Sequence, residues 1–369
     1  MKFVVAAVAA SLASAAATSA VAQSASEAGL RGAYTMDALG NVSGGFRRSA
    51  SVVQRADLGF NSDVANGWSV AATVSATTGR SVSARAVGDV QGVQGVYAGG
   101  NAIWLYEIRL IRTFENGEFS IGRMSSGDAF GSVDGMEQFV NSAFSSNGGA
   151  ISINDPGRLP SPASSWGARG EWRWENGAEV RGGAFLSDPR RANADNPRDP
   201  AFDPNDGVLA FAEGSIAPRE GWRAGLGVWA DSARFDTLSG GTRRGNQGAY
   251  AFVTGRLAGE ENWRRLDGFA MLQVAPRRDR SLMPWSGVAG VTLRQPFEGR
   301  DDDSANLAIT VGRFSRESGR SGSETTIEAN YRYALTDQIA IRPVAQYVIN
   351  PGGLYRDALV LGVHLEAEL

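Results

Sequence analysis

The sequence predicts an all-β fold: a 16-stranded antiparallel transmembrane β-barrel with one loop folded into its interior. Apolar and polar residues alternate along most of the chain, as in strands with hydrocarbon on one side and water on the other. Short turns and long loops are sorted to opposite ends of these strands, which is typical of membrane barrels. The 47 glycines among 369 residues also argue against long helices, because glycine destabilises them.

Sixteen segments carry the alternation, and most are close to the roughly 9–11 residues that a tilted strand needs to cross a bilayer. The phase is weaker in 178–186, 208–216 and 247–257, where either face could point inward. The expected strands are residues 30–38, 48–60, 67–77, 102–114, 118–124, 165–174, 178–186, 208–216, 222–231, 247–257, 266–275, 285–294, 304–314, 324–335, 338–348 and 358–369.

The clearest segments show which face meets lipid. In 324–335, apolar residues such as Ile327 alternate with polar ones such as Glu328. In the last segment, apolar residues from Leu361 to Leu369 fill every second position, and Glu366 lies among the polar residues between them. A barrel that closes the last strand on the first leaves no unpaired edge in the hydrocarbon.

The connections support the same fold. At one end they are mostly short and include two Glu-Asn-Gly turns, at 115–117 and 175–177, which favour hairpins. Two connections at that end, 258–265 and 295–303, are longer. The long loops at the other end are 78–101, 125–164, 187–207 and 232–246. Outer-membrane barrels have this asymmetry, whereas a soluble sandwich has no reason for it.

The N-terminus has the features of a secretory signal. Lys2 gives a positive start, residues 3–17 are small and apolar, and Ala20-Val21-Ala22 precedes Gln23 as a cleavage site. We therefore expect residues 1–22 to be a signal peptide and residues 23–369 to be a single barrel domain. After the signal, no run of about 18 apolar residues occurs that could form a membrane-spanning helix.

Tryptophans are expected near both ends of the barrel, where bilayer interfaces favour aromatic residues. Four belong to the short-turn end: Trp68, Trp172, Trp174 and Trp222. Three belong to the long-loop end: Trp104, Trp166 and Trp285.

Sixteen strands enclose an aqueous channel. A charge on the lipid face would cost about 2–4 kcal/mol near the midplane, so the charged phase of each strand should point inward. Arginines beside glutamates can exchange hydrogen bonds with a polyhydroxylated solute, although ion pairs that only support the wall are the alternative for each residue. Trp229 could offer a flat apolar face to a sugar ring. The inward charges are Arg31, Arg55, Glu107, Arg109, Arg169, Glu171, Arg223, Arg294, Glu328, Arg332 and Arg342.

The segment 125–164 is too polar and glycine-rich to form another pair of strands. We expect it to fold into the lumen as a constriction loop. A surface loop with no constricting role is the alternative.

Composition argues against several other functions. The chain has no cysteine, so thiol chemistry and disulfides are excluded, and Lys2 is its only lysine, so a phosphate-binding Walker motif is excluded. The net charge of −3 gives no general attraction to nucleic acid. The single histidine, His364, makes a catalytic triad a weak alternative. The acidic stretches 203–207 and 301–303 match no calcium-loop spacing, so we expect no metal site and no cofactor.

Several motifs, taken in order, resemble one family. FSIGRMSSGDAF (119–130), QFVNSAF (138–144) and SSWGAR (164–169) are similar to a strand, an inserted loop and the next strand of the OprB-type carbohydrate-selective porins. IEANYRY (327–333), RPVAQYVINPGG (342–353) and the C-terminal DALVLGVHLEAEL are similar to the end of that family's barrel. The chain departs from the usual outer-membrane pattern in ending with Leu369 instead of an aromatic residue.

The resemblance implies a channel in a Gram-negative outer membrane that passes glucose and related small sugars by passive diffusion. It implies constriction positions at Glu107, Arg109, Arg123, Asp128 and Phe130. The expected partners are carbohydrate solutes, outer-membrane lipids and lipopolysaccharide, and the outer-membrane assembly machinery. A general or anion-preferring porin for small organic acids is the alternative, because arginines are in excess on the inward phase. Whether the barrel is a monomer or a homotrimer stays open.

Overall fold

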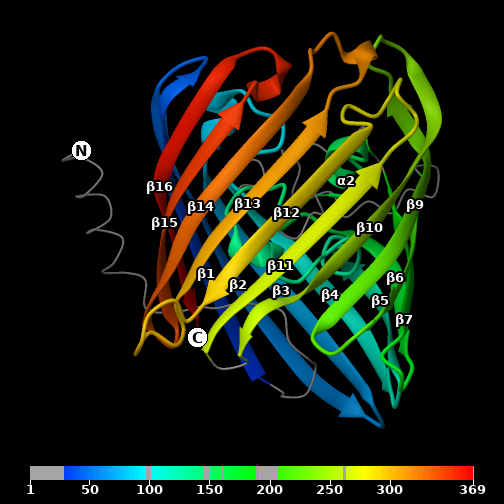
Figure 1. Ribbon diagram of the computed structural model, residues 1–369. Helices are drawn as coiled ribbons and strands as arrows, with labels where there is room; N and C mark the ends of the chain where they lie inside the picture. The colour runs from blue at the N-terminus through cyan, green and yellow to red at the C-terminus, as the bar shows by residue number, and fades with distance from the viewer. Residues whose placement is uncertain are drawn as a thin grey trace.

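Sixteen antiparallel strands form one closed sheet, in which each strand pairs with its neighbours along the chain (Figure 1). The ring closes where β1 pairs with β16, from Ala33 opposite Glu368 to Gly45 opposite Arg356. The computed structural model describes residues 29–96, 101–144, 150–159, 161–187, 189, 207–260 and 263–368. The expected signal peptide and the terminal Leu369 lie outside these residues. No helix in the described part of the chain is both long and apolar enough to cross a membrane.

The strands follow the sequence segments closely. The first eight are β1 (Gly29–Gly45), β2 (Ser49–Ala65), β3 (Trp68–Gly79), β4 (Ala102–Phe114), β5 (Gly117–Met124), β6 (Ser165–Arg173), β7 (Glu179–Leu186) and β8 (Val208–Ile216). The other eight are β9 (Trp222–Asp236), β10 (Thr242–Glu260), β11 (Trp263–Val274), β12 (Trp285–Arg294), β13 (Ser304–Arg313), β14 (Ser323–Thr336), β15 (Ile339–Ile349) and β16 (Arg356–Glu368).

Helical turns occur only in connections within the described residues. They are η1 (Ser83–Val87), η2 (Met136–Gln138), α2 (Ile151–Asn154), η3 (Arg316–Ser318) and η4 (Pro351–Gly353). Of these, η2 and α2 belong to the connection between β5 and β6, which is the expected constriction loop.

All sixteen expected strands are confirmed, but two connections were misjudged. The expected long loop 232–246 is a short connection between Asp236 and Thr242, because β9 and β10 extend beyond the bilayer-spanning length. The expected connection 258–265 shrinks for the same reason, since β10 runs to Glu260 and β11 begins at Trp263. Alternation fades where both faces of a strand meet water, so the sequence shows the membrane-spanning part better than the strand ends.

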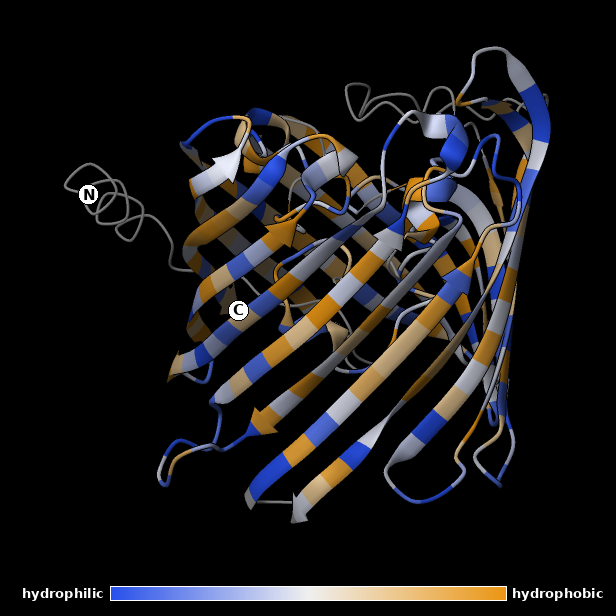
Figure 2. Cartoon of the chain, turned by 45° about the horizontal axis from the view of Figure 1, so that its top comes forward, coloured by the Kyte–Doolittle hydropathy of each residue, from blue (hydrophilic) through white to orange (hydrophobic). Residues whose placement is uncertain are grey.

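The two faces of the wall differ as the alternation predicts. Outward side chains such as Leu226, Leu307 and Leu361 are 68%, 52% and 44% exposed, because they face what would be lipid. Inward polar side chains such as Thr326 and Gln346 are fully buried. Figure 2 shows hydrophobic and hydrophilic residues alternating along the strands, with hydrophilic residues gathered in the end turns.

Most of the tryptophans occupy the expected girdles. The side chains that face outward are Trp68, Trp166, Trp172, Trp174 and Trp285, each between 37% and 49% exposed. Trp104 is an exception, because it is only 3% exposed and its indole N–H donates to Thr77 Oγ1 at 3.1 Å. Its placement in the outer girdle was therefore wrong: it lies on the inward face of β4.

Candidate functional site in the barrel lumen

The connection 125–164 packs against the inner wall formed by β7 to β13. The Phe130 ring stacks on Phe211 of β8 with centroids 4.9 Å apart, and it meets Phe185 of β7 edge-on. Phe139 makes an edge contact with Phe269 of β11 at 5.8 Å. A Cβ on Gly183 would lie 2.9 Å from the Phe130 ring, so glycine permits this close approach. An apolar core therefore lies inside the barrel, between the connection and one side of the wall.

Polar contacts tie the same connection to the opposite strands. Glu328 of β14 accepts hydrogen bonds from the backbone N–H groups of Val140 and Asn141, both at 2.8 Å. The Asn141 side chain donates to Gln346 Oε1 of β15 at 3.1 Å. Since buried N–H groups need acceptors, Glu328 serves as an anchor for this connection.

The connection between β3 and β4 also turns inward, and it packs against β1, β14, β15 and β16. Val82, Val87 and Val93 are fully buried in an apolar cluster with Val348 and Val360 of the wall. Glu324 of β14 accepts from the backbone N–H groups of Val90 and Gln91. Two connections from the long-loop end thus occupy part of the lumen.

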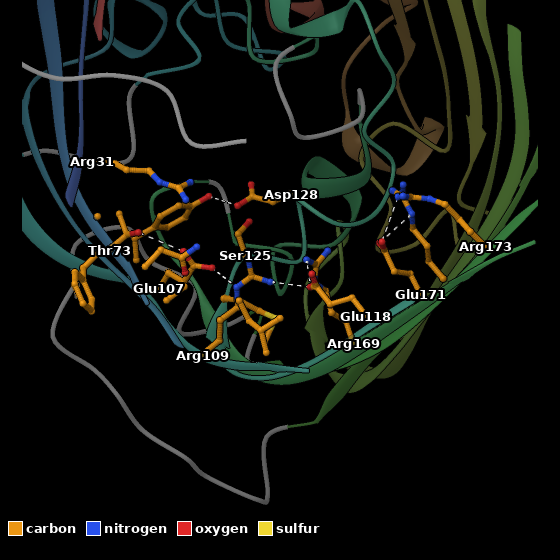
Figure 3. Close-up of a pocket in the computed structure, with 18 residues that line it drawn as sticks. Arg31, Thr73, Glu107, Arg109, Glu118, Ser125, Asp128, Arg169, Glu171 and Arg173 are labelled. Carbon is orange, nitrogen blue, oxygen red and sulfur yellow. Dashed lines mark hydrogen bonds and ion pairs between the residues drawn. The ribbon is translucent and has the colours of Figure 1, made fainter. Parts of the chain in front are cut away.

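The remaining space includes a cavity of about 440 Å³ along the inner wall of β1 to β7, toward the short-turn end (Figure 3). Its lining has five arginines and four carboxylates, so its charge is nearly balanced. The charged residues that line it are Arg31, Glu107, Arg109, Glu118, Asp128, Arg169, Glu171, Arg173 and Arg181.

Positive and negative side chains alternate along the wall of this cavity on β4, β5 and β6, and we call this row the charge ladder. Arg109 of β4 pairs with Glu107 on its own strand and reaches Glu118 Oε1 of β5 at 3.4 Å. The same Glu118 oxygen accepts from Arg169 of β6 at 3.1 Å. Thr73 of β3 donates to Glu107 at 3.3 Å, which extends the ladder at its first end. The guanidinium groups of Arg109 and Arg169 are each held in place by ion pairs with neighbouring glutamates (Figure 3).

The ladder continues along the part of the wall that residues 125–164 cover, which we call the inserted connection. Glu171 of β6 lies 3.7 Å from Arg181 of β7, and Arg181 lies 3.9 Å from Glu213 of β8. Glu213 also pairs with Arg223 of β9 at 3.2 Å. Arg223 lines a second cavity of about 310 Å³ against β9 to β12, so the ladder connects the two cavities.

A bulge in β4 adds an aromatic residue to the site. Thr73 and Val74 of β3 lie opposite Glu107 and Leu105, so Tyr106 is the extra residue. Bulges place consecutive side chains on one face, and here both Tyr106 and Glu107 line the cavity. The Tyr106 hydroxyl donates to Asp128 of the inserted connection.

Arg55 of β2 lies beside this tyrosine. Its guanidinium carbon is 5.0 Å from the centre of the Tyr106 ring. It also donates to Asp57 Oδ1 at 2.9 Å and to Ser161 Oγ at 2.6 Å. Arg55 therefore joins the wall to the far end of the inserted connection.

Six of the expected pore-lining residues line neither cavity, and Arg55, which joins the wall to residues 125–164, is one of them. Phe130 and Trp229 are 1% and 3% exposed in the apolar core, so neither ring is available to a solute. Glu328 is fully buried as an anchor. Arg123 is buried, with its Nε donating to the Leu105 carbonyl and to Ser164 Oγ at 3.0 Å. Arg332 pairs with Glu366 away from both cavities.

Other residues of the site were missed. The inward position of Glu118 follows from its alternation with the exposed Phe119 and Ile121, which the sequence already shows. The inward Tyr106 could have been found as well. The apolar series of β4 changes phase between Leu105 and Ile108, and such a slip indicates a bulge.

Arg181 lies in the predicted segment 178–186, where the sequence left the inward face undecided. The inward face of this strand also carries the apolar Phe185, so polar residues do not occupy every inward position and the alternation is difficult to recognise.

Comparison with known proteins agrees with this geometry. A model of the family described as carbohydrate-selective porins of the OprB family matches residues 48–369. The chain belongs to the OprB family of carbohydrate-selective porins. Its placement in this family indicates an outer-membrane location. No curated protein matches the chain.

Solved structures share the fold of this OprB-family chain. A high-pH structure of Pseudomonas putida OprB matches with a TM-score of 0.84 at 18% identity, covering 92% of this chain and 93% of that one. A low-pH structure of the same protein matches with a TM-score of 0.59 at 16% identity, covering 92% of each. A mutant of Rh. blastica porin matches at 0.52 and 10% identity, covering 92% of this chain and all of that one.

Proposed function

We propose that this porin lets small neutral sugars, such as glucose, diffuse passively through the space beside the inserted connection. The observation that carries the proposal is the charged lining of the larger cavity, in which five arginines nearly balance four carboxylates. A balanced wall gives little reason to concentrate either ion, whereas its donors and acceptors suit hydroxyl groups. Solutes would exchange hydrogen bonds with the ladder as they pass.

The inserted connection would narrow the lumen in this account. Its apolar core against Phe185 and Phe211 holds it to one side, and its polar contacts with Glu328 and Gln346 hold it to the other. A cavity of about 440 Å³ falls within the usual range for small-molecule sites. The side chains that would contact the solute are Glu107, Arg109, Glu118, Asp128, Arg169 and Glu171.

Uptake by liposomes tests the proposal. Liposomes that contain the protein should swell quickly in isotonic glucose and more slowly in an isotonic salt of gluconate, a carboxylate of similar size. In a salt gradient the reversal potential should stay close to zero. Fast gluconate entry with a strongly anion-selective potential would instead favour a pore for small organic acids, which the one extra arginine could support.

A further inference from the structure

The second cavity of the lumen, about 310 Å³ in volume, lies at the short-turn end of β9 to β12. Arg265 is near the beginning of β11 and Arg294 ends β12, so both arginines belong to strand ends. The inserted connection forms another side, since the Thr254 hydroxyl donates to the Asp134 carbonyl at 3.0 Å. Phe269 of the apolar core closes the side toward the long-loop end. The cavity is therefore open toward the short-turn end.

One carboxylate holds two arginines at this cavity. Asp267 Oδ1 accepts from Arg265 Nε at 2.6 Å, and Asp267 Oδ2 accepts from Arg294 Nε at 2.9 Å. In the part of the chain that the structure describes, the terminal nitrogens of these two arginines have no further hydrogen-bond partner. Two guanidinium groups are thus fixed in place and still have donors to offer to a solute.

This arrangement reverses the order of the charge ladder in the larger cavity. There Arg109 lies between two carboxylates, those of Glu107 and Glu118. At the second cavity one carboxylate lies between two guanidinium groups, and the lining as a whole has three arginines and two aspartates. Since a partly enclosed site with an excess of one charge attracts the opposite charge, the second cavity favours an anionic group.

The same cavity offers partners for hydroxyl groups. Thr292 of β12 lies directly opposite Asp267 in the sheet, and it lines the cavity together with Thr254. Because the Thr254 hydroxyl gives its proton to the Asp134 carbonyl, its oxygen is left to accept. The volume lies at the lower end of the range for small-molecule sites, which favours a single sugar unit over a longer chain.

We propose that the second cavity binds a monosaccharide that carries a carboxylate, such as a uronic acid. The carboxylate would lie between the terminal nitrogens of Arg265 and Arg294, and the sugar hydroxyls would meet Thr254 and Thr292. Guanidinium groups suit this role because their paired donors match the two oxygens of a carboxylate. Retention here would slow a sugar acid at the short-turn end without excluding it. The site differs from the glucose pathway in both place and ligand, and it does not depend on whether glucose passes.

Saturation-transfer NMR of the full chain in detergent micelles, at constant ionic strength, tests this proposal. The probes are glucuronate, glucose and acetate, so that the first differs from the second by its carboxylate and from the third by its sugar ring. Wild-type protein should bind glucuronate at least fivefold more tightly than either of the others. R265Q/R294Q should bind glucuronate at least fivefold more weakly and should keep its affinity for glucose within twofold.

The matched control is R277Q/R278Q, which removes two exposed arginines from a connection at the opposite end of the barrel. It should bind all three probes as the wild type does. Heat-modified mobility on gels checks that the variants are folded. The single variant R294Q, at a strand end with a side chain that is 45% exposed, should still weaken glucuronate binding several-fold.

Three results would overturn the proposal: glucuronate bound no more tightly than glucose, acetate bound as tightly as glucuronate, or equal losses of glucuronate affinity in R265Q/R294Q and R277Q/R278Q. A different result separates this site from the glucose pathway. Glucose that fails to bind, while glucuronate binding still depends on Arg265 and Arg294, would support the site and contradict the pathway.

Discussion

The Phe130 ring lies parallel to that of Phe211, at an interplanar angle of 8° and a centroid distance of 4.9 Å. This contact joins the connection between β5 and β6 to the inner wall. It explains how a barrel of sixteen strands holds a polar, glycine-rich segment in one place. The segment has an apolar side that packs on the wall, and the space it leaves is lined by charge.

Replacing Phe130 with alanine should loosen this segment. Removal of a buried phenylalanine usually costs about 3–5 kcal/mol, because it loses burial and leaves a void. We expect F130A to lower the resistance of the barrel to unfolding by urea and to raise the noise of its single-channel current. F119A is the control, because Phe119 is 40% exposed on the lipid face. Similar quiet currents in both variants would contradict the packing role of Phe130.

Glu328 should hold the part of residues 125–164 that contacts β14 in place, because it accepts hydrogen bonds from the backbone of Val140 and Asn141. Leucine at this position would leave the N–H groups of Val140 and Asn141 without their acceptor, at about 1–3 kcal/mol for each buried group. Hydrogen exchange should then accelerate by tenfold or more over residues 138–144. The control is E317L, since Glu317 is exposed in a distant connection. Unchanged protection in E328L would show that the apolar core alone holds the segment.

Glu118 bridges two arginines of the ladder, Arg109 and Arg169. Glutamine at this position removes one negative charge and increases the excess of arginines over carboxylates in the cavity from one to two. We expect E118Q to shift the reversal potential toward anions in a salt gradient and to weaken glucose binding several-fold. E220Q removes the same charge from an exposed turn and should change neither quantity. Equal shifts in both variants would mean that the ladder does not set selectivity.

The stability of the connection between β3 and β4 should depend on pH through Asp89. Burial raises the pKa of the Asp89 carboxyl from its ordinary 3.8 to about 6. The folded connection therefore favours the protonated acid: its stabilisation is complete below pH 4 and is lost as the pH rises through about 6. Protection of residues 82–93 from hydrogen exchange, corrected for intrinsic rates, should fall between about pH 4 and 6 and change little above that range. D89N should remove this dependence, and a persistent fall in D89N would assign it to another group.

The sequence revealed the strands better than the site. Alternation was sufficient for all sixteen strands because lipid and water impose opposite demands on adjacent residues. It was weakest in 178–186, 208–216 and 247–257, and the reason is physical. The inward faces of these strands carry large apolar residues such as Leu209 and Phe252, because the inserted connection covers them instead of water.

The same cause misplaced two candidate residues. Phe130 and Trp229 were expected at the pore surface, as an apolar residue inside an aqueous channel would be. A local pattern cannot show that an inserted segment converts part of the lumen into a core. The positions of several charged candidates were predicted more accurately. Glu107, Arg109, Arg169 and Glu171 line the larger cavity. Their inward phase was constrained by the cost of charge in lipid.

Single-channel conductance with glucose titrated into the bath tests the central claim most directly. If the ladder lines a sugar pathway, glucose at millimolar concentrations should block the current of the wild-type protein saturably, and E118Q should need several-fold more glucose for the same block. The E220Q control should match the wild type. A conducting pore whose current ignores glucose in all three proteins would contradict the sugar pathway, and a protein that never conducts would contradict the channel itself.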